Sequence, residues 1–177
     1  MTDTSAWVMQ GLEALAPGSR VLDFAAGSGR HARAADSLGL ATTAVDRDAQ
    51  ALAGIGGAVR CLVADLEADP WPSELTEFEA VVVCNYLYRP RFAELCGLLA
   101  PGGLLLYETF ARGNEAYGRP SNPDFLLEPG ELFERCRSAG LFVLAYEDGF
   151  VGAGRRARVQ RARALRPPAN LERFAIE

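Results

Sequence analysis

Apolar runs alternate along this chain with segments whose apolar residues recur at helical spacing. The apolar runs predict six strands, at residues 20–24, 41–46, 59–64, 81–84, 104–107 and 141–146. The amphipathic segments predict helices at residues 5–15, 30–38, 48–54, 91–99 and 131–139. Because strand and helix signals alternate, we expect βαβ units in an α/β fold with a mostly parallel sheet.

The length of 177 residues supports one domain with a substantial core. We expect residues 1–177 to form that domain, with an N-terminal helical segment at 1–17 and a tail at 167–177. A polar and aromatic loop at 109–127 has no clear secondary-structure signal. Loops of this length are usually functional or disordered, so this one is predicted to be a lid, with a plain surface loop as the alternative.

A glycine-rich turn follows the first strand and leads into a helix. Asp23 lies near the end of the strand, and Gly27 and Gly29 lie in the turn. The arrangement is typical of nucleotide pockets in doubly wound folds, although the G-x-G-x-x-A spacing alone is weak evidence. A dinucleotide would bring a pyrophosphate close to Asp23, whereas S-adenosylmethionine (SAM) would bring an ammonium and a sulfonium. The carboxylate therefore favours SAM over NAD(P).

Two further strands also end in an aspartate, Asp46 after the second and Asp65 after the third. The carboxyl ends of parallel strands line one crevice, so we expect Asp23, Asp46 and Asp65 to converge on one ligand. Asp46 lies where such folds bind ribose hydroxyls, a role compatible with capping the next helix. The alternative for Asp65 is a loop acid that faces water.

Composition excludes several classes of function. All 18 basic residues are arginine, which excludes a Walker A lysine and a Schiff-base lysine. Any serine or cysteine hydrolase would have to use the single histidine, His31. The four cysteines form no C-x-x-C pair, and we expect no metal site.

Charge and hydropathy argue against nucleic acid and membranes as binding partners. The net charge is −5, and no aromatic residues interleave with the arginines of residues 155–166, so nucleic-acid binding is not expected. No apolar run approaches the length of a membrane span, and residues 1–3 do not resemble the start of a signal peptide. We therefore expect a cytoplasmic protein, and the sequence leaves its oligomeric state open.

The first three strand ends resemble the first three motifs of class I SAM-dependent methyltransferases. The first motif usually reads V-L-D-x-G-x-G-x-G, and this chain reads V-L-D-F-A-A-G-S-G. Ala25 replaces the first glycine, and because alanine is disfavoured at positive φ, the shape of the turn is left open. The pattern E-T-F-x-x-G-N-E-x-x-G-x-P-x-N-P-x-F-L-L-x-P-G-E-L, at residues 108–132, resembles the tellurite-resistance-type branch. The resemblance spans residues 18–147.

This resemblance implies a doubly wound, mostly parallel seven-stranded sheet with an antiparallel last strand, the Rossmann-like methyltransferase fold. Residues 156–165 would form that last strand, in a hairpin with the sixth. It implies SAM as the cofactor, with its methionine moiety at the glycine turn, its ribose at the second strand and its adenine at the third. The residues that we expect to bind SAM are Asp23, Ala25, Gly27, Gly29, Asp46, Arg47, Asp65, Leu66 and Asn85.

The chemistry is expected in the loops after the fourth and fifth strands, which leave the sheet on the ligand side. Methyl transfer from a sulfonium needs mainly alignment and desolvation. A base is needed only when the acceptor carries a proton at neutral pH. Asn85 is the candidate for holding the acceptor, and Tyr88 and Glu108 are the candidates for the base.

The acceptor itself is expected to be a small molecule, anionic or thiol-bearing. Guanidinium groups make paired hydrogen bonds to carboxylates and oxyanions. Arg89 follows the fourth strand, and the loop after the fifth contains Arg112, Tyr117 and Arg119. We expect Arg89, Arg112 and Tyr117 to bind the acceptor. The alternative is that the arginines pair with the carboxylates Glu108, Glu115 and Asp124 of the chain.

Two other functions stay open at this point. The first is an NAD(P)-dependent oxidoreductase with a Rossmann domain, which only the glycine spacing favours. The second is a non-catalytic SAM-binding regulatory module, which only the substitution of Ala25 for glycine motivates. The leading hypothesis is SAM-dependent methyl transfer to a small molecule.

Overall fold

The computed structural model of the chain describes residues 4–68, 70–152 and 156–168. Some sequence predictions fall outside these residues: part of the N-terminal segment (1–3), one residue of the turn after the third strand (Asp69), one arginine of the basic C-terminal region (Arg155) and most of the tail (169–177). No helix among the described residues is long and apolar enough to cross a membrane.

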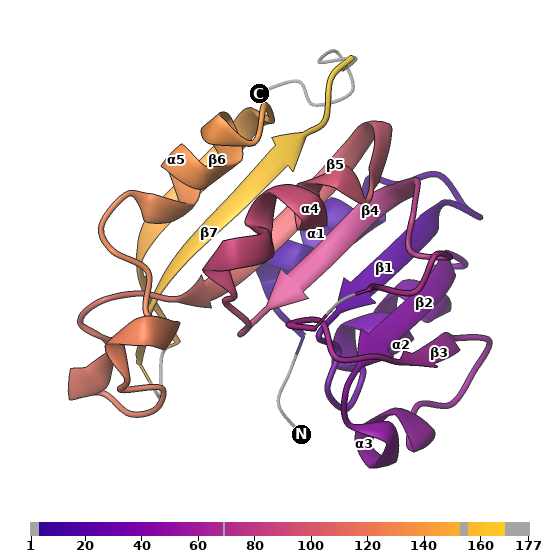
Figure 1. Cartoon of the computed structure of the whole chain (residues 1–177), viewed down its shortest axis with the longest axis horizontal. Coiled ribbons are helices and arrows are strands. Elements are labelled where there is room, and N and C mark those ends of the chain that lie inside the picture. The colour runs from indigo at the N-terminus through magenta and orange to yellow at the C-terminus, as the bar shows by residue number, and fades with distance from the viewer. Residues whose placement is uncertain (1–3, 69, 153–155, 169–177) are drawn as a thin grey trace.

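The sheet contains seven strands: β1 (Arg20–Phe24), β2 (Ala41–Asp46), β3 (Arg60–Val63), β4 (Phe78–Cys84), β5 (Leu99–Phe110), β6 (Phe142–Val151) and β7 (Ala157–Leu165). Their order is β3-β2-β1-β4-β5-β7-β6 (Figure 1). Strands β1 to β5 pair in parallel, and β7 runs antiparallel to both β5 and β6. This confirms the predicted mostly parallel sheet with an antiparallel last strand. The order reverses between β1 and β4, which is where such sheets bind ligands.

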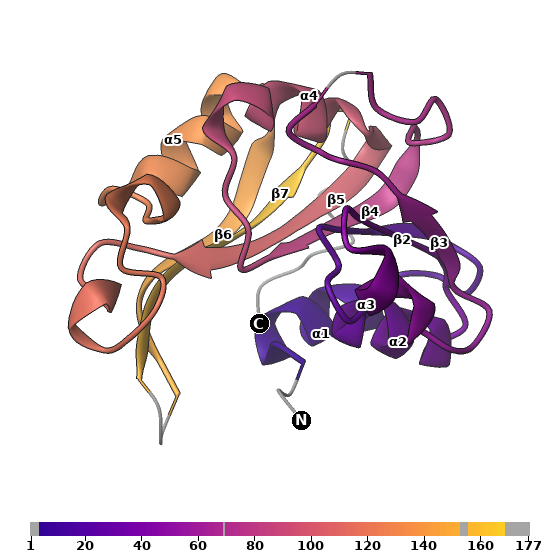
Figure 2. The ribbon, with the colours of Figure 1, turned by 60° about the horizontal axis from the view of Figure 1, so that its bottom comes forward.

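Helices cover both faces of this sheet (Figure 2). The α-helices are α1 (Ala6–Glu13), α2 (Arg30–Ser37), α3 (Ala49–Ala53), α4 (Phe92–Gly97) and α5 (Glu131–Ser138). Short 3-10 helices are η1 (Arg89–Arg91), η2 (Asn114–Ala116) and η3 (Pro123–Phe125). The helices α1, α2 and α3 lie on one face, and α4 and α5 lie on the other.

The central strand β4 shows why the sheet needs two covers. Val81, Val82 and Val83 are each at most 1% exposed. Successive side chains of a strand point to opposite faces of the sheet, so burial of all three requires a cover on both faces. Val82 lies in the same apolar cluster as Leu12 of α1, whereas Val81 and Val83 belong to the cluster that contains Phe92 of α4. A continuous apolar run is therefore the pattern that this position requires.

The start of β5 differs from the prediction. The Pro-Gly-Gly segment at residues 101–103 lies inside β5, which begins at Leu99, instead of before the strand. A Cβ at Gly103 would lie 2.7 Å from the Phe78 carbonyl oxygen, so glycine permits the strands to approach here. The β4–β5 register shifts between Phe78 and Ala80. The turn residues thus form an irregular first part of the strand.

No helix occurs among the described residues between β3 and β4, where Pro70 and Pro72 restrict the backbone. Trp71 takes the place of a helix on this part of the sheet. Its ring meets Phe24 edge-on, with centroids 5.4 Å apart, and the Arg91 guanidinium lies over the Trp71 ring, 3.9 Å from its centroid. The indole N–H donates to the Leu66 carbonyl at 2.9 Å. Trp71 therefore fixes the chain just after β3.

Candidate functional site

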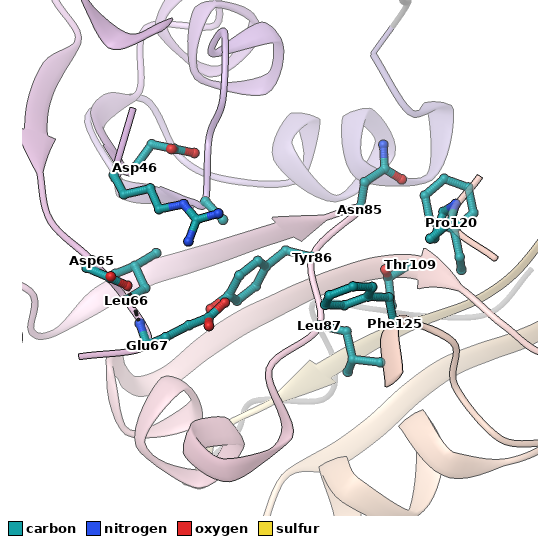
Figure 3. Close-up of a pocket in the computed structure, with 13 residues that line it drawn as sticks. Asp46, Asp65, Leu66, Glu67, Asn85, Tyr86, Leu87, Thr109, Pro120 and Phe125 are labelled. Carbon is teal, nitrogen blue, oxygen red and sulfur yellow. Dashed lines mark hydrogen bonds between the residues drawn. The ribbon is translucent and has the colours of Figure 1, made fainter. Parts of the chain in front are cut away.

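A cavity of about 670 Å³ opens at the carboxyl ends of the central strands (Figure 3). Small-molecule sites usually measure about 300–1,000 Å³. The cavity runs from the ends of β2 and β3, across β4, to the end of β5 and the loop after it. Six of the predicted site residues line it: Ala25, Asp46, Arg47, Asp65, Leu66 and Asn85.

The acidic end of the cavity lies beyond β2 and β3. Its charged residues are the carboxylates Asp46, Asp65 and Glu67 and one guanidinium, that of Arg47. Figure 3 shows Asp46 on one side and Asp65 with Glu67 across from it. Asp65 Oδ1 accepts a hydrogen bond from the Glu67 N–H at 3.0 Å, and Leu66 between them is buried. Three negative charges and one positive charge leave this end with a net charge of −2, which favours a ligand of net positive charge.

The glycine turn borders this end. The Gly27 N–H donates to Asp46 Oδ2 at 2.7 Å, and Gly29 precedes α2 at φ 70°. Ala25 adopts φ 57°, the left-handed conformation that the family pattern supplies with glycine. The shape of the turn, which the sequence left open, therefore includes a positive φ angle at Ala25 although this residue is not glycine. Gly27 and Gly29 shape the turn and lie outside the cavity wall.

Asp23 lies beneath the turn, 3% exposed and outside the cavity wall. Its Oδ2 accepts a hydrogen bond from the Ala32 N–H, in the first turn of α2, at 2.9 Å. Burial raises the pKa of Asp23 to about 7, although the Ala32 hydrogen bond and the Arg30 charge lower it. The structure thus gives this carboxylate a structural partner where the sequence predicted direct contact with the cofactor.

Asn85 and Tyr86 form the centre of the cavity, at the end of β4. Asn85 adopts φ 59°, and its N–H donates to the Glu108 carbonyl at 2.9 Å. The Tyr86 ring packs edge-on against Phe24, with centroids 5.8 Å apart, and its carbonyl accepts from the Tyr107 hydroxyl at 2.8 Å. The Tyr86 hydroxyl is buried without a hydrogen-bond partner among the described residues. Burial, with the Glu67 and Asp65 charges, raises the pKa of Tyr86.

The opposite end of the cavity, which we call the uncharged end, lies beyond β5. Its wall consists of Leu87, Thr109, Phe110, Pro120 and Phe125. In Figure 3, Phe125 and Pro120 come from the loop after β5, and Thr109 comes from the strand. The Phe125 side chain is 51% exposed, which leaves much of its ring open to solvent.

The loop after β5 is held to the rest of the fold by a buried asparagine. Asn114 Nδ2 donates to the Pro120 carbonyl at 3.1 Å, and its Oδ1 accepts from the Arg158 N–H on β7 at 3.2 Å. Nearby, Gln160 of β7 accepts from the Leu132 N–H at 3.0 Å and donates to the Glu128 carbonyl at 2.6 Å. Strand β7 therefore supports both the loop and the first turn of α5.

Arg89, a predicted acceptor-binding residue, does not line the cavity. Its guanidinium makes paired hydrogen bonds to Glu131, at 2.7 and 2.9 Å, and donates to the carbonyls of Asp124 and Leu126. Burial tends to raise the pKa of Glu131, but hydrogen bonds from Arg89, from the Glu128 N–H and from Arg135 hold it at about 2. Arg89 therefore fastens the loop to α5.

Arg112 also lies outside the cavity wall, and its Nε donates to Glu128 at 2.7 Å. Tyr117 packs edge-on against Phe150 of β6, with ring centroids 5.2 Å apart. The predicted acceptor residues Arg89, Arg112 and Tyr117 are thus not brought together at the cavity. The alternative, that the arginines pair with carboxylates of the chain, holds for Arg89 and Arg112, although the partners are Glu131 and Glu128.

Neither candidate base faces the cavity. Glu108 points to the α1 side of the sheet, where it accepts from the Ser5 hydroxyl at 2.9 Å and lies 3.5 Å from Arg161. Tyr88 lies outside the wall, just before η1. His31 is buried on the same side as Glu108, and its Nε2 accepts from the Ser5 N–H at 3.2 Å. Glu108 and His31 thus hold the start of α1 on the sheet through Ser5.

Sequence reasoning missed seven residues of the wall: Glu67, Tyr86, Leu87, Thr109, Phe110, Pro120 and Phe125. Three of them, Glu67, Tyr86 and Thr109, directly follow a predicted site residue. That adjacency was the available signal. In the loop after β5, the sequence analysis selected mainly charged side chains as acceptor-binding residues, whereas the loop residues of the wall are Pro120 and Phe125.

No family model matches the sequence, and no curated protein does. Several solved structures are similar. TehB from Haemophilus influenzae has a TM-score of 0.73 at 16% identity, over 94% of this chain and 63% of TehB. A TehB-like SAM-dependent methyltransferase from Corynebacterium glutamicum has a TM-score of 0.66 at 18% identity, over 92% of this chain and 89% of that one. The [4+2]-cyclase SpnF has a TM-score of 0.66 at 16% identity, over 90% and 80%.

The chain therefore spans somewhat less than two thirds of the Haemophilus TehB. At these identities the likeness concerns the fold. The described residues have the fold of the class I SAM-dependent methyltransferases, as the sequence predicted.

Proposed function

We propose that this chain, which has the fold of the class I SAM-dependent methyltransferases, transfers a methyl group from SAM to a small-molecule acceptor. The observation that carries the proposal is the charge of the cavity, with Asp46, Asp65 and Glu67 opposed by Arg47 alone at its acidic end. SAM carries a sulfonium, an ammonium and a carboxylate, and so has a net positive charge. A dinucleotide carries an anionic pyrophosphate, which this end would repel.

The roles proposed for the acidic end follow the order of the strands. Asp46 accepts hydrogen bonds from the ribose hydroxyls, while Arg47, Asp65 and Leu66 contact the adenine. The turn that contains Ala25, Gly27 and Gly29 holds the methionine moiety. Asp23, buried below that turn, supports this moiety by fixing the start of α2 through the hydrogen bond from the Ala32 N–H.

SAM supplies an activated methyl group, so the residues of the chain need mainly to align and desolvate the acceptor. Asn85 lies between the two ends of the cavity and holds the acceptor beside the donor. The apolar side chains of the uncharged end reduce the hydration of the reacting atoms.

Of the two predicted kinds of acceptor, anionic and thiol-bearing, the thiol-bearing one has the better support. Arg89 and Arg112, which motivated an anionic acceptor, bind Glu131 and Glu128. Tyr88 and Glu108 lie outside the wall, so the acceptor has to lose its proton to water. A thiol, with a pKa of about 8.5, does so appreciably at neutral pH. The cytoplasmic location stays a prediction.

A second candidate, SAM binding without methyl transfer, is favoured by one comparison, since the similar protein SpnF is a cyclase. The substitution of Ala25 for glycine, which motivated this candidate in the sequence, now supports it less, because Ala25 adopts a positive φ angle as a glycine would. An NAD(P)-dependent oxidoreductase is opposed by the acidic cavity end.

Calorimetry with SAM, S-adenosylhomocysteine (SAH) and NADH tests these alternatives. The proposal expects SAM and SAH to bind and NADH not to bind. Binding of NADH alone would refute it. SAM labelled in its methyl group, incubated with the protein and a metabolite extract, then separates methyl transfer from binding alone, since only transfer moves the label into a new compound.

A further inference from the structure

The two ends of the cavity differ in charge. Among the described residues, all four ionised side chains of the wall lie at the acidic end, and none belongs to the uncharged end. The polar atoms near the uncharged end come from Asn85 and the Thr109 hydroxyl. The remaining surface is that of Leu87, Phe110 and Pro120, together with the half-exposed ring of Phe125.

Two arginines close in sequence to this end have other partners, and a third, Arg119, is exposed and does not line the wall. Arg89 is bound by Glu131 through two hydrogen bonds and by two loop carbonyls, and Arg112 is bound by Glu128. Turning Arg89 toward an acceptor would strip Glu131, whose side chain is 14% exposed, of its paired partner. Glu131 would keep Arg135 as a cationic partner but lose the paired hydrogen bonds from Arg89, and this loss opposes the rearrangement.

We infer that the uncharged end binds an acceptor with an uncharged, mainly apolar body and a single nucleophilic group. The inference rests on the proposed function, because it assigns the acidic end to SAM. An acceptor with an anionic body would lose hydration at this end and gain no cation in return. An apolar body would instead cover the exposed face of Phe125 and remove apolar surface from water.

This environment also suits a thiol as the nucleophilic group. The thiol releases its proton to water, and a sulfur lone pair then forms a bond to the methyl carbon. The bond between that carbon and the donor sulfur breaks, and its electron pair stays on the donor sulfur. The negative charge of the thiolate and the positive charge of the sulfonium both disappear in this step, so apolar surroundings favour it.

Two matched thiols test the acceptor body: benzyl mercaptan and 4-(mercaptomethyl)benzoate. A methylene group insulates the thiol from the ring in both, so the nucleophile is the same and only the carboxylate differs. We expect kcat/KM with SAM to be at least about tenfold higher for benzyl mercaptan. Equal or better use of the carboxylated thiol would overturn the inference.

Binding of SAH distinguishes the inference from the proposed function. If SAH binds and neither thiol is methylated, the inference on the acceptor is wrong and the assignment of the donor end stands. If SAH does not bind, the proposed function itself fails.

A charge placed in the uncharged end provides a second test. Phe125→Arg should largely remove the preference, raising kcat/KM for 4-(mercaptomethyl)benzoate relative to benzyl mercaptan by about tenfold. Phe142→Arg is the matched control, because Phe142 is 50% exposed, nearly the same as Phe125, and lies on β6 outside the cavity wall. An unchanged ratio in Phe125→Arg, or the same change in both variants, would contradict the assigned acceptor end.

Discussion

The Gly27 N–H donates a 2.7 Å hydrogen bond to Asp46 Oδ2, which joins the turn after β1 to the end of β2. The other oxygen of Asp46 accepts from the Asp48 N–H at 2.9 Å. Each carboxylate oxygen keeps a lone pair for a further donor. The same side chain therefore shapes the turn and offers acceptors to the proposed ribose.

Asp46→Ala should weaken SAH binding by about 1–3 kcal/mol, because the ribose loses a charged acceptor and the turn loses its tether. Calorimetry measures the dissociation constant. Asp48→Ala is the control: Asp48 accepts from the N–H groups of Gln50 and Ala51 at the start of α3 and lies outside the wall. That variant should lose about 1 kcal/mol of stability and keep its affinity. Equal affinities in both variants would remove Asp46 from the site.

Ala25→Gly should stabilise the protein by up to about 1 kcal/mol. An alanine at φ 57° carries a steric cost that glycine lacks, and the greater freedom of glycine in the unfolded chain offsets part of the gain. Ala26→Gly, one residue along and not at positive φ, should instead destabilise by about 0.5–1 kcal/mol. Urea denaturation of the two variants checks for these opposite signs, and a loss of stability in both would speak against strain at Ala25.

Asp23 should make the stability depend on pH. Its pKa is about 7 in the folded protein and 3.8 as a free side chain, so between these values only the folded state keeps the proton. The free energy of unfolding should therefore fall as the pH rises from about 4 to about 7, by at most about 1.4 kcal/mol per unit.

Asp23→Asn, which cannot ionise and can still accept from the Ala32 N–H, should lack this slope. Urea denaturation of the wild type and the variant at pH 5 and pH 7.5 isolates the contribution, because the other titrating groups cancel in the difference. Parallel pH profiles would show that Asp23 titrates normally.

Arg89→Ala should destabilise the protein by roughly 2–3 kcal/mol, because Glu131 loses one of its two cationic partners and two loop carbonyls lose a donor. Arg112→Ala should cost less than about 0.5 kcal/mol, since Arg112 and Glu128 are both largely exposed. Thermal denaturation compares the two. If Arg112→Ala were the more damaging, the roles assigned to the two pairs would be wrong.

Tyr86→Phe should leave stability unchanged or raise it slightly, because the deleted hydroxyl is buried without a partner among the described residues. Tyr107→Phe should lower stability by about 1 kcal/mol, because the Tyr107 hydroxyl donates to the Tyr86 carbonyl. The two variants delete the same atom from neighbouring side chains. A larger loss in Tyr86→Phe would reveal a partner for its hydroxyl.

The parts of the fold that follow from periodicity could be predicted from the sequence. The bounds of β2, Ala41–Asp46, agree with the prediction, and the antiparallel β7 follows from the resemblance. The beginning of β5 could not be predicted, because Gly103 there serves a contact with Phe78, which is distant in sequence. Local turn chemistry does not reveal such a contact.

The site shows the same division. Asp46 and Asp65 follow strands whose ends must meet in a parallel sheet, so their place was predictable. Arg89 has the chemistry of a ligand-binding residue, but its partner Glu131 lies 42 positions away. Which cations are neutralised within the chain is decided by tertiary packing, and the sequence alone could not show it.

The place of β7 between β5 and β6 bears on the order in which the protein is completed during synthesis. The proposed donor end needs only β1 to β4 and the residues just after them, and these leave the ribosome first. The Asn114 and Gln160 contacts that support the acceptor loop and α5 need β7, close to the carboxyl terminus of the chain. A nascent chain halted before Ala157 would leave β6 without its neighbour. Such a chain could complete the nucleotide half of the sheet before the half that selects what is methylated.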